Sequence, residues 1–314
     1  MARESQLVSG PDPHTAGPST HAGAARLLAV AAAILFSTGG AGIKVEAFTA
    51  AQVSFMRSGI AAIALLLWLR GFSRPVAAHQ QRVAWSTPAL VAGLIYAAML
   101  TLFVTATKLT TAANAIFLQS TAPLYLLVLA PLVLGERFRA RDLVYLFALA
   151  AGLAFCFMGR PTATATASNP ALGNLLGAAS GFVWALTLIS LRYVGRRDPS
   201  GSGSLTAVVA GNAFACLAAL PMALPLPMAS AAEWATVAYL GVFQIGLAYL
   251  CLAVAISRLP ALEISLLLLL EPVLNPIWTW LIRGEDPGRW TIAGGTMIVT
   301  ATAAKLLYDA RRPP

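Results

Sequence analysis

The chain has 314 residues, of which 58% are hydrophobic and only 11% are charged, whereas an ordinary soluble domain has about 25% charged residues. This composition excludes a water-soluble globular protein. A nucleic-acid-binding surface is also not expected despite the formal net charge of +9, because so few charges cannot form a continuous basic face.

The first 21 residues are rich in Gly, Pro, Ser, Thr and His and contain no apolar run. They predict a disordered tail rather than a signal peptide. After this tail, ten apolar runs approach the roughly 20 residues that cross a hydrocarbon core. The runs cover residues 27–43, 51–69, 88–107, 112–134, 143–158, 172–191, 205–220, 234–256, 261–282 and 291–308. Because backbone groups inside a bilayer must be satisfied internally, we expect an all-α integral membrane protein with ten transmembrane helices.

Lys and Arg are distributed unevenly between the two faces that these crossings define. The face that holds the N-terminus collects 15 of them, the opposite face collects five, and Arg57 lies inside the second run. Basic residues near helix ends stay on the cytoplasmic side of a membrane. Both termini, including the tail, are therefore predicted to be cytoplasmic.

An internal repeat relates residues 111–158 to residues 260–307 without a gap. Pro123 aligns with Pro272 and Glu136 with Glu285, each pair 149 positions apart. We therefore expect two halves of five helices each, residues 22–160 and 161–314. Because five is odd, the second half enters the membrane from the opposite side, which makes the repeat inverted. Inverted repeats favour alternating access to a site near the bilayer midplane, so the pattern predicts a transporter.

The repeated segments resemble those of a known family. The first copy contains Ala112-Ala113-Asn114-Ala115, Ala122-Pro123-Leu124 and Leu134-Gly135-Glu136; the second contains Leu259-Pro260-Ala261, Leu270-Glu271-Pro272-Val273 and Gly284-Glu285. Both copies are similar to the EamA repeat of the drug/metabolite transporter (DMT) superfamily, although Arg283 replaces the usual apolar residue before Gly284. As a whole the chain most resembles the bacterial YddG-type exporters of aromatic and other amino acids. The resemblance implies an inner-membrane exporter of amino acids, large neutral and aromatic ones included, and of related small metabolites.

Glu271 lies near the centre of the ninth run, where an ionised carboxylate costs about 2.5–3.5 kcal/mol on insertion scales. One interpretation is a site for proton coupling or for a substrate amine. The other is a neutral carboxyl group that is hydrogen-bonded to a neighbouring helix and serves only the structure. The resembled family often has Glu before this proline, and both interpretations stay open.

Arg57 lies six positions past the start of the second run, about 9 Å below the outer surface at 1.5 Å per residue. Its guanidinium group can bind a substrate carboxylate with two parallel hydrogen bonds. Alternatively it clamps helix ends through Glu46 or backbone carbonyls. The resembled family often carries Arg here whatever the substrate, which favours the clamp.

Aromatic and amide side chains inside the runs are candidates for a substrate cavity, because a large apolar cavity with a few polar groups suits amphipathic amino acids or flat organic molecules. These candidates are Tyr96, Gln119, Tyr125, Trp184, Gln244, Tyr249 and Trp278. For any one of them, ordinary packing between helices or at the interface belts is the simpler explanation.

Four further residues have predicted structural roles in the repeated segments. Pro123 and Pro272 weaken the hydrogen-bond ladders of the fourth and ninth helices and are expected to act as hinges. Glu136 and Glu285 close the same two helices, where they can accept N–H groups from the helix that follows.

Neither a cofactor nor a metal is expected. The three histidines lie in the tail and in a charged loop, and the three cysteines lie in apolar runs, so no metal cluster or disulfide framework is predicted. No phosphate loop, Gly-x-Ser-x-Gly elbow or His-Glu-x-x-His motif is present. Two alternatives stay open: a proton-coupled exporter of cationic drugs such as quaternary ammonium compounds, and, from another class, an intramembrane enzyme or scaffold. A ten-helix chain with both repeats can form the whole pathway as a monomer.

Overall fold

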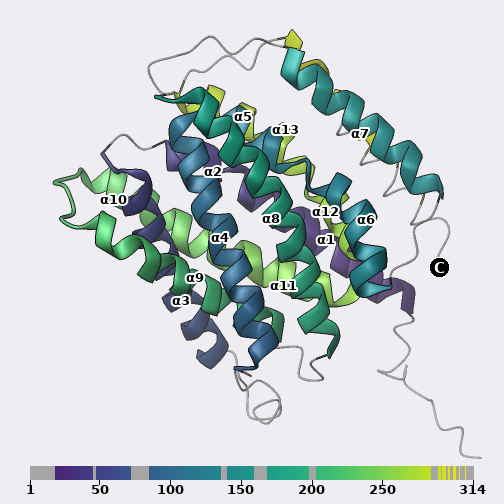
Figure 1. Cartoon of the computed structure of the whole chain (residues 1–314), viewed down its shortest axis with the longest axis horizontal. Coiled ribbons are helices and arrows are strands. Elements are labelled where there is room, and N and C mark those ends of the chain that lie inside the picture. The colour runs from purple at the N-terminus through teal and green to yellow at the C-terminus, as the bar shows by residue number, and fades with distance from the viewer. Residues whose placement is uncertain are drawn as a thin grey trace, which may run out of the picture.

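The computed structural model describes residues 18–44, 47–71, 85–135, 140–158, 168–197, 203–283 and, beyond these, residues 289, 290, 292–294, 296, 297, 300, 301, 304 and 308. Residues 1–17 of the expected tail and the expected boundary between the halves lie outside the described residues. All secondary structure in the described part is helical (Figure 1). The helices of the N-terminal half are α1 (Pro18–Ser37), α2 (Gly39–Ile43), α3 (Ala50–Gly71), α4 (Thr87–Leu109), α5 (Ala112–Gln119), α6 (Ala122–Leu134) and α7 (Ala140–Met158).

The C-terminal half begins with a 28-residue helix and contains one segment of π-helix. Its elements are α8 (Pro170–Arg197), α9 (Gly203–Ala223), α10 (Ala231–Tyr239), the π-helix η1 (Leu240–Leu247), α11 (Ala248–Arg258), α12 (Ala261–Leu267) and α13 (Leu270–Arg283). Here α10, η1 and α11 form one continuous span from Ala231 to Arg258. A π-helix inside a longer helix often marks a functional site.

The described helices confirm an all-helical, multi-pass membrane architecture. Seven continuous helical segments are long and apolar enough to cross a membrane, or eight if the pair Ala112–Leu126 and Val128–Leu134, which are bent by 52° relative to each other, counts as one span. The fifth expected crossing coincides with α7, where the apolar helix Leu143–Gly152 is shorter. Much of the tenth expected crossing lies outside the described residues. The total of ten helices therefore stays a prediction.

The fourth and ninth expected crossings are each broken into two helices at equivalent positions. Ser120 and Thr121 separate α5 from α6, and Leu268 and Leu269 separate α12 from α13. Each break lies just before a proline of the repeated segment. Pro123 is in the first turn of α6, where the missing N–H group costs no helical hydrogen bond. The two copies thus share a local structure, while the hinge motion itself stays a prediction.

Helices from the two halves pack closely against one another, so the chain forms one bundle around a common core. The α4 helix packs along α8 and α9, α3 packs on α9 and η1, and α1 packs on α11 and α13 (Figure 1). A Cβ atom at Gly181 of α8 would lie 2.6 Å from the Leu118 carbonyl oxygen of α5. One at Gly211 of α9 would lie 2.5 Å from the Tyr96 ring. Small residues thus permit the close approach of these helices.

Candidate functional site

A cavity lies where the two halves meet in the middle of the bundle. Residues from α1, α3, α4, α5, α8, η1, α11 and α13 line it, namely Phe36, Arg57, Met99, Leu100, Phe103, Gln119, Trp184, Gln244, Ile245, Tyr249 and Glu271. Its volume is about 30 Å³, which is room for only a few water molecules. The cavity is therefore too small for an organic molecule in this structure, and a larger molecule binds only if the lining residues move apart.

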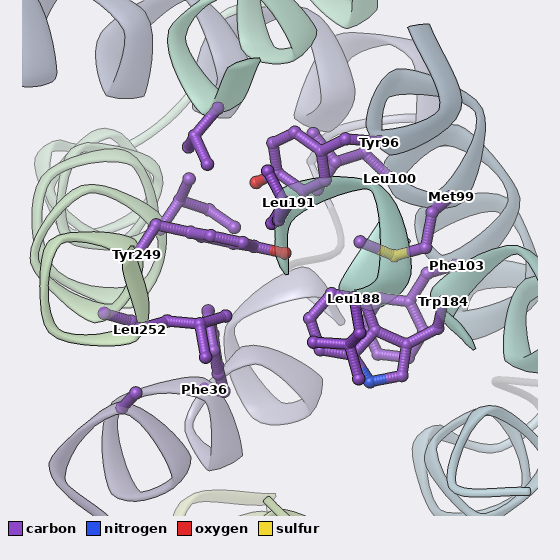
Figure 2. Close-up of a cluster of buried hydrophobic side chains, with 14 of the residues drawn as sticks. Phe36, Tyr96, Met99, Leu100, Phe103, Trp184, Leu188, Leu191, Tyr249 and Leu252 are labelled. Carbon is purple, nitrogen blue, oxygen red and sulfur yellow. The ribbon is translucent and has the colours of Figure 1, made fainter. Parts of the chain in front are cut away.

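The cavity combines a mostly aromatic wall with a few polar groups. The rings of Tyr249 and Phe36 pack edge to face with centroids 4.9 Å apart, and Trp184 approaches Tyr249 edge-on at 6.4 Å. Phe103 and Trp184 also line the cavity and belong to the same buried cluster, which Figure 2 shows. Aromatic walls with a few convergent polar groups are typical of small-molecule sites.

Arg57 is the cation of the cavity. It lies in the first half of α3, its side chain is buried, and its Nη1 donates to Gln244 Oε1 at 3.5 Å. Its Nε atom has no hydrogen-bond partner among the described residues. Glu46, considered above as a clamp partner, lies outside the described residues, and no described backbone carbonyl accepts a hydrogen bond from Arg57. The guanidinium group thus retains donors that a ligand can use.

Glu271 is the acid of the cavity and lies in the first turn of α13. Its side chain is partly exposed to the cavity. No described residue donates a hydrogen bond to its carboxylate, and within the described part of the chain the one ion pair joins Arg26 to Glu263 instead. Arg57 and Glu271 therefore line the same space without forming an ion pair with each other. No described residue of a neighbouring helix donates a hydrogen bond to Glu271 in this structure, and both interpretations of this residue stay predictions.

Two glutamines complete the polar lining, and the side-chain amide nitrogen of each donates a hydrogen bond to another residue of the bundle. Gln119 Nε2 donates to Met99 Sδ at 3.3 Å, and Gln244 Nε2 donates to the Phe36 carbonyl oxygen at 3.4 Å. The amide oxygen of Gln244 accepts from Arg57, as described above, and no described donor reaches the amide oxygen of Gln119. The cavity thus offers acceptor groups as well as the guanidinium donors.

A smaller cavity of about 10 Å³ adjoins the first at the two helix breaks. Gln119, Trp184 and Glu271 line both cavities. The remaining residues that line the smaller one are Ser120, Ala122, Pro123, Ser265, Leu268 and Leu269. The breaks of α5–α6 and α12–α13 are therefore in direct contact with the site.

Six of the nine residues proposed from the sequence as cavity residues or intramembrane charges line the main cavity: Arg57, Gln119, Trp184, Gln244, Tyr249 and Glu271. Tyr96 is buried behind it, with its ring 4.7 Å from that of Tyr249 (Figure 2).

Tyr125 and Trp278 line neither cavity. Tyr125 packs edge to face on Phe182 at 5.3 Å, and Trp278 Nε1 donates to Ser37 Oγ at 2.8 Å. In this structure both therefore pack between helices, which was the simpler explanation.

Five lining residues were not singled out from the sequence: Phe36, Met99, Leu100, Phe103 and Ile245. They are apolar side chains in apolar helices, and no local pattern distinguishes them from core residues. A helical wheel cannot find them, because α4 is apolar around its whole circumference. Of the predicted structural residues, Pro272 is buried in α13, while Glu136 and Glu285 lie outside the described residues.

The fold and the cavity define a multi-pass helical membrane protein with a cavity lined by residues of both halves. Comparisons with known proteins identify the family. The model of the EamA-like transporter family matches residues 24–158 and 171–305. The chain therefore belongs to the EamA-like transporter family of the DMT superfamily and is a membrane transporter with two EamA repeats.

Individual relatives cover most of the chain. The "Pseudopaline exporter CntI" proteins of two Pseudomonas aeruginosa strains, UCBPP-PA14 and PAO1, are each 30% identical to it, over 284 and 285 residues respectively. Both alignments cover 88% of this chain and 94% of the relative. One crystal structure shares the fold with a TM-score of 0.70 at 19% identity, over 93% of this chain and 99% of the other.

Proposed function

We propose that this protein exports amino acids and related small metabolites, with large neutral and aromatic amino acids foremost, across a bacterial inner membrane by alternating access. The observation that carries the proposal is that Arg57 and Glu271 line one cavity without pairing with each other. A zwitterion supplies both missing partners at once. Its carboxylate fits the guanidinium group of Arg57, and its ammonium group fits the carboxylate of Glu271.

The walls of the cavity favour an apolar substrate side chain. Phe36, Phe103, Trp184 and Tyr249 supply aromatic surface beside the two charges. Aromatic pairs contribute about 0.5–1.5 kcal/mol beyond the burial of their area. The resemblance of the whole chain to YddG-type exporters supports the same class of substrate. The cavity of about 30 Å³ is smaller than an amino acid, so binding requires a conformation in which this space is wider.

Two further observations support the proposed direction of transport and the proposed orientation in the membrane. The P. aeruginosa relatives are named as exporters of pseudopaline, which supports outward transport of a small metabolite. The excess of Lys and Arg on the face of the N-terminus supports cytoplasmic termini. Alternating access fits two repeats whose broken helices both contact the site.

An exporter of cationic drugs is the second candidate function. The partnerless carboxylate of Glu271 beside aromatic rings is a suitable environment for a lipophilic cation. Arg57 in the same cavity opposes it, because a cation without a carboxylate leaves the guanidinium group unpaired at a depth where an unpaired charge is costly. The geometry therefore favours zwitterions.

The test is flux in proteoliposomes that contain only this purified chain. Counterflow of a labelled aromatic amino acid is compared with that of its decarboxylated amine, with and without an imposed proton gradient. We expect the wild type to move the amino acid at least about tenfold faster than the amine, since a charge-assisted hydrogen bond contributes about 1.5–3 kcal/mol. Amino acid flux without a gradient indicates a facilitated exporter, and flux only with a gradient assigns proton coupling to the transporter.

Variants connect the flux to the site. Arg57→Gln and Glu271→Gln are each expected to remove most amino acid transport, whereas the exposed Arg258 lies outside both cavities, and Arg258→Gln is expected to leave transport unchanged. Faster flux of the amine than of the amino acid would favour the drug-exporter function. Absence of flux for both compounds would contradict the substrate class proposed here.

A further inference from the structure

We infer that Gln244 determines the charge of the substrate that the cavity accepts, because it holds Arg57 in place without neutralising it. The site then selects molecules that bring their own carboxylate. This inference rests on the proposed function, namely that the cavity takes zwitterions. It adds a positioning residue and a rule of specificity to that proposal.

The contacts of Gln244 fix the orientation of its amide group. Its Nε2 donates to the Phe36 carbonyl oxygen at 3.4 Å, and its Oε1 accepts from Arg57 Nη1 at 3.5 Å. Only the NH₂ group of an amide can donate to a carbonyl, so the oxygen is left facing the guanidinium group. Gln244 thereby links Arg57 of α3 to the C-terminal end of α1.

Two glycines and the π-helix make room for this link. A Cβ atom at Gly39 would lie 2.7 Å from Gln244 Nε2, so a larger residue there would displace the amide. A Cβ atom at Gly241, in η1, would lie 3.0 Å from the Arg57 carbonyl oxygen and 2.6 Å from the Ile60 Cβ. The absence of side chains at these positions brings η1 against α3 and Gln244 against Arg57. Gly39, Gly241 and the π-helix therefore all contribute to the contact between Gln244 and Arg57.

The formal charge of the cavity depends on the fact that the side chain of Gln244 is neutral. Arg57 and Glu271 are the strongly charged residues that line the main cavity, so their formal charges cancel. A neutral amide supplies one acceptor to Arg57, while Nε stays without a described partner. The guanidinium group of Arg57 consequently still needs an anionic partner, and the carboxylate of the substrate supplies it. A glutamate at position 244 would supply the anion from within the protein.

Gln244→Glu therefore should change which substrate is transported rather than only how fast. The new carboxylate would pair with Arg57 and leave the cavity with a net charge of −1, which suits an amine that lacks a carboxylate. We expect the ratio of amino acid flux to amine flux to fall by about tenfold to a hundredfold, the range of a charge-assisted hydrogen bond. Part of this change should be an absolute gain in amine flux, which a merely damaged protein does not show.

Gln119→Glu is the matched control, because it places the same new charge in the same cavity. Gln119 contacts Met99 rather than Arg57, so the guanidinium group keeps its need for an external carboxylate. We expect this variant to retain a clearly higher ratio of amino acid to amine than Gln244→Glu. Equal ratios in the two variants would show a general effect of charge and would overturn the role of Gln244.

Gln244→Met provides a second test that adds no buried charge. It keeps the approximate length of the side chain but removes the acceptor that aligns Arg57. We expect a higher KM for the amino acid with the preference for the carboxylate retained, because the guanidinium group stays charged. An unchanged KM would overturn the positioning role even if Gln244→Glu failed to fold.

The outcomes separate the two proposals. A wild-type protein that moves amine and amino acid equally would overturn both of them. A wild type that prefers the amino acid, together with a Gln244→Glu variant that keeps this preference, would overturn the inference about Gln244 alone. Loss of the preference in Gln244→Glu, with its retention in Gln119→Glu, would support both.

Discussion

The two broken helices, α5–α6 in the first repeat and α12–α13 in the second, have the same backbone design but different chemistry. Both are interrupted for two residues just before a proline. In the register that aligns these prolines, the second copy carries Glu263 where the first has Asn114, and Glu271 where the first has Ala122. The repeat therefore preserves the shape of the helix, while within the broken helices themselves acidic side chains occur only in the second copy.

The two acidic residues of α12 and α13, Glu263 and Glu271, differ in whether the protein supplies a counter-charge. Glu263 Oε1 accepts from Arg26 Nε of α1 at 2.8 Å and is neutralised by this ion pair. Glu271 has no such partner and borders the cavity. An acid inside a membrane protein therefore does not identify a ligand site by itself. What distinguishes the two residues is whether the protein already supplies the counter-charge.

The ion pair between Arg26 and Glu263 has a neutral counterpart, which is formed by Asn174 and Asn114. Leu27-Leu28 and Leu175-Leu176 align when the starts of α1 and α8 are compared, which places Asn174 opposite Arg26 in the register. Asn114 Nδ2 donates to Asn174 Oδ1 at 3.5 Å, and Thr110 Oγ1 donates to the same oxygen at 2.9 Å. Two equivalent pairs of helices thus differ in chemistry: α1 meets α12 through an ion pair, and α8 meets α5 through amides.

The largest expected effect comes from moving the free acid to the other repeat. The double change Ala122→Glu and Glu271→Ala keeps one acid on an equivalent helix. We expect amino acid flux to fall about tenfold to a hundredfold, as for Glu271→Ala alone, given about 1.5–3 kcal/mol for a charge-assisted contact. The reason is that Ala122 lines only the smaller cavity, away from Arg57. Flux near the wild-type level in the double variant would show that the repeats are interchangeable.

A further difference between the copies predicts a large loss of stability. Asn275 of α13 aligns with Leu126 of α6 and donates to the Ser37 carbonyl oxygen at 2.9 Å. A Cβ atom at Gly40, in α2, would overlap this buried amide. We expect Gly40→Ala to lower the free energy of unfolding by about 1–3 kcal/mol, the usual cost of overpacking.

Thermal or denaturant unfolding in detergent measures this effect. Gly23→Ala is the control, because a Cβ atom there has no neighbour within 4 Å. Equal stability of the two variants would mean that α13 can shift away from α2 at no cost.

These differences show how far the sequence could predict the site. The gapless alignment of Pro123 with Pro272 predicted that the fourth and ninth helices bend in equivalent regions, because backbone constraints repeat with the residue type; it did not predict that each is divided into two helices. Glu271 and Arg57 were found because charges are rare in apolar runs. That they share a cavity without pairing depends on how η1, α3 and α13 pack, which no local pattern encodes. For the same reason Phe36 and Phe103 gave no signal.

The ion pair of the second repeat should contribute a moderate amount of stability. Its two side chains are 20% and 16% exposed, so Glu263→Gln is expected to cost about 1 kcal/mol, near the upper end for exposed pairs. The charge-reversed double variant, Arg26→Glu with Glu263→Arg, should recover part of the loss. A double-mutant cycle measures the coupling between the two side chains, and a coupling energy of zero would remove the pair from the comparison.

The smallest effect is expected at the neutral counterpart. Asn114→Ala removes a 3.5 Å amide contact, while the 2.9 Å bond from Thr110 to Asn174 stays intact. Hydrogen bonds between transmembrane helices contribute about 0.6 kcal/mol on average, so the loss should be smaller than for Glu263→Gln. The free energies of unfolding of Glu263→Gln and Asn114→Ala are measured in the same detergent. The difference between their losses compares the stabilising contact between α1 and α12 with that between α8 and α5. A larger loss at Asn114 would reverse the comparison, because the amide contact would then be the stronger link between its two helices.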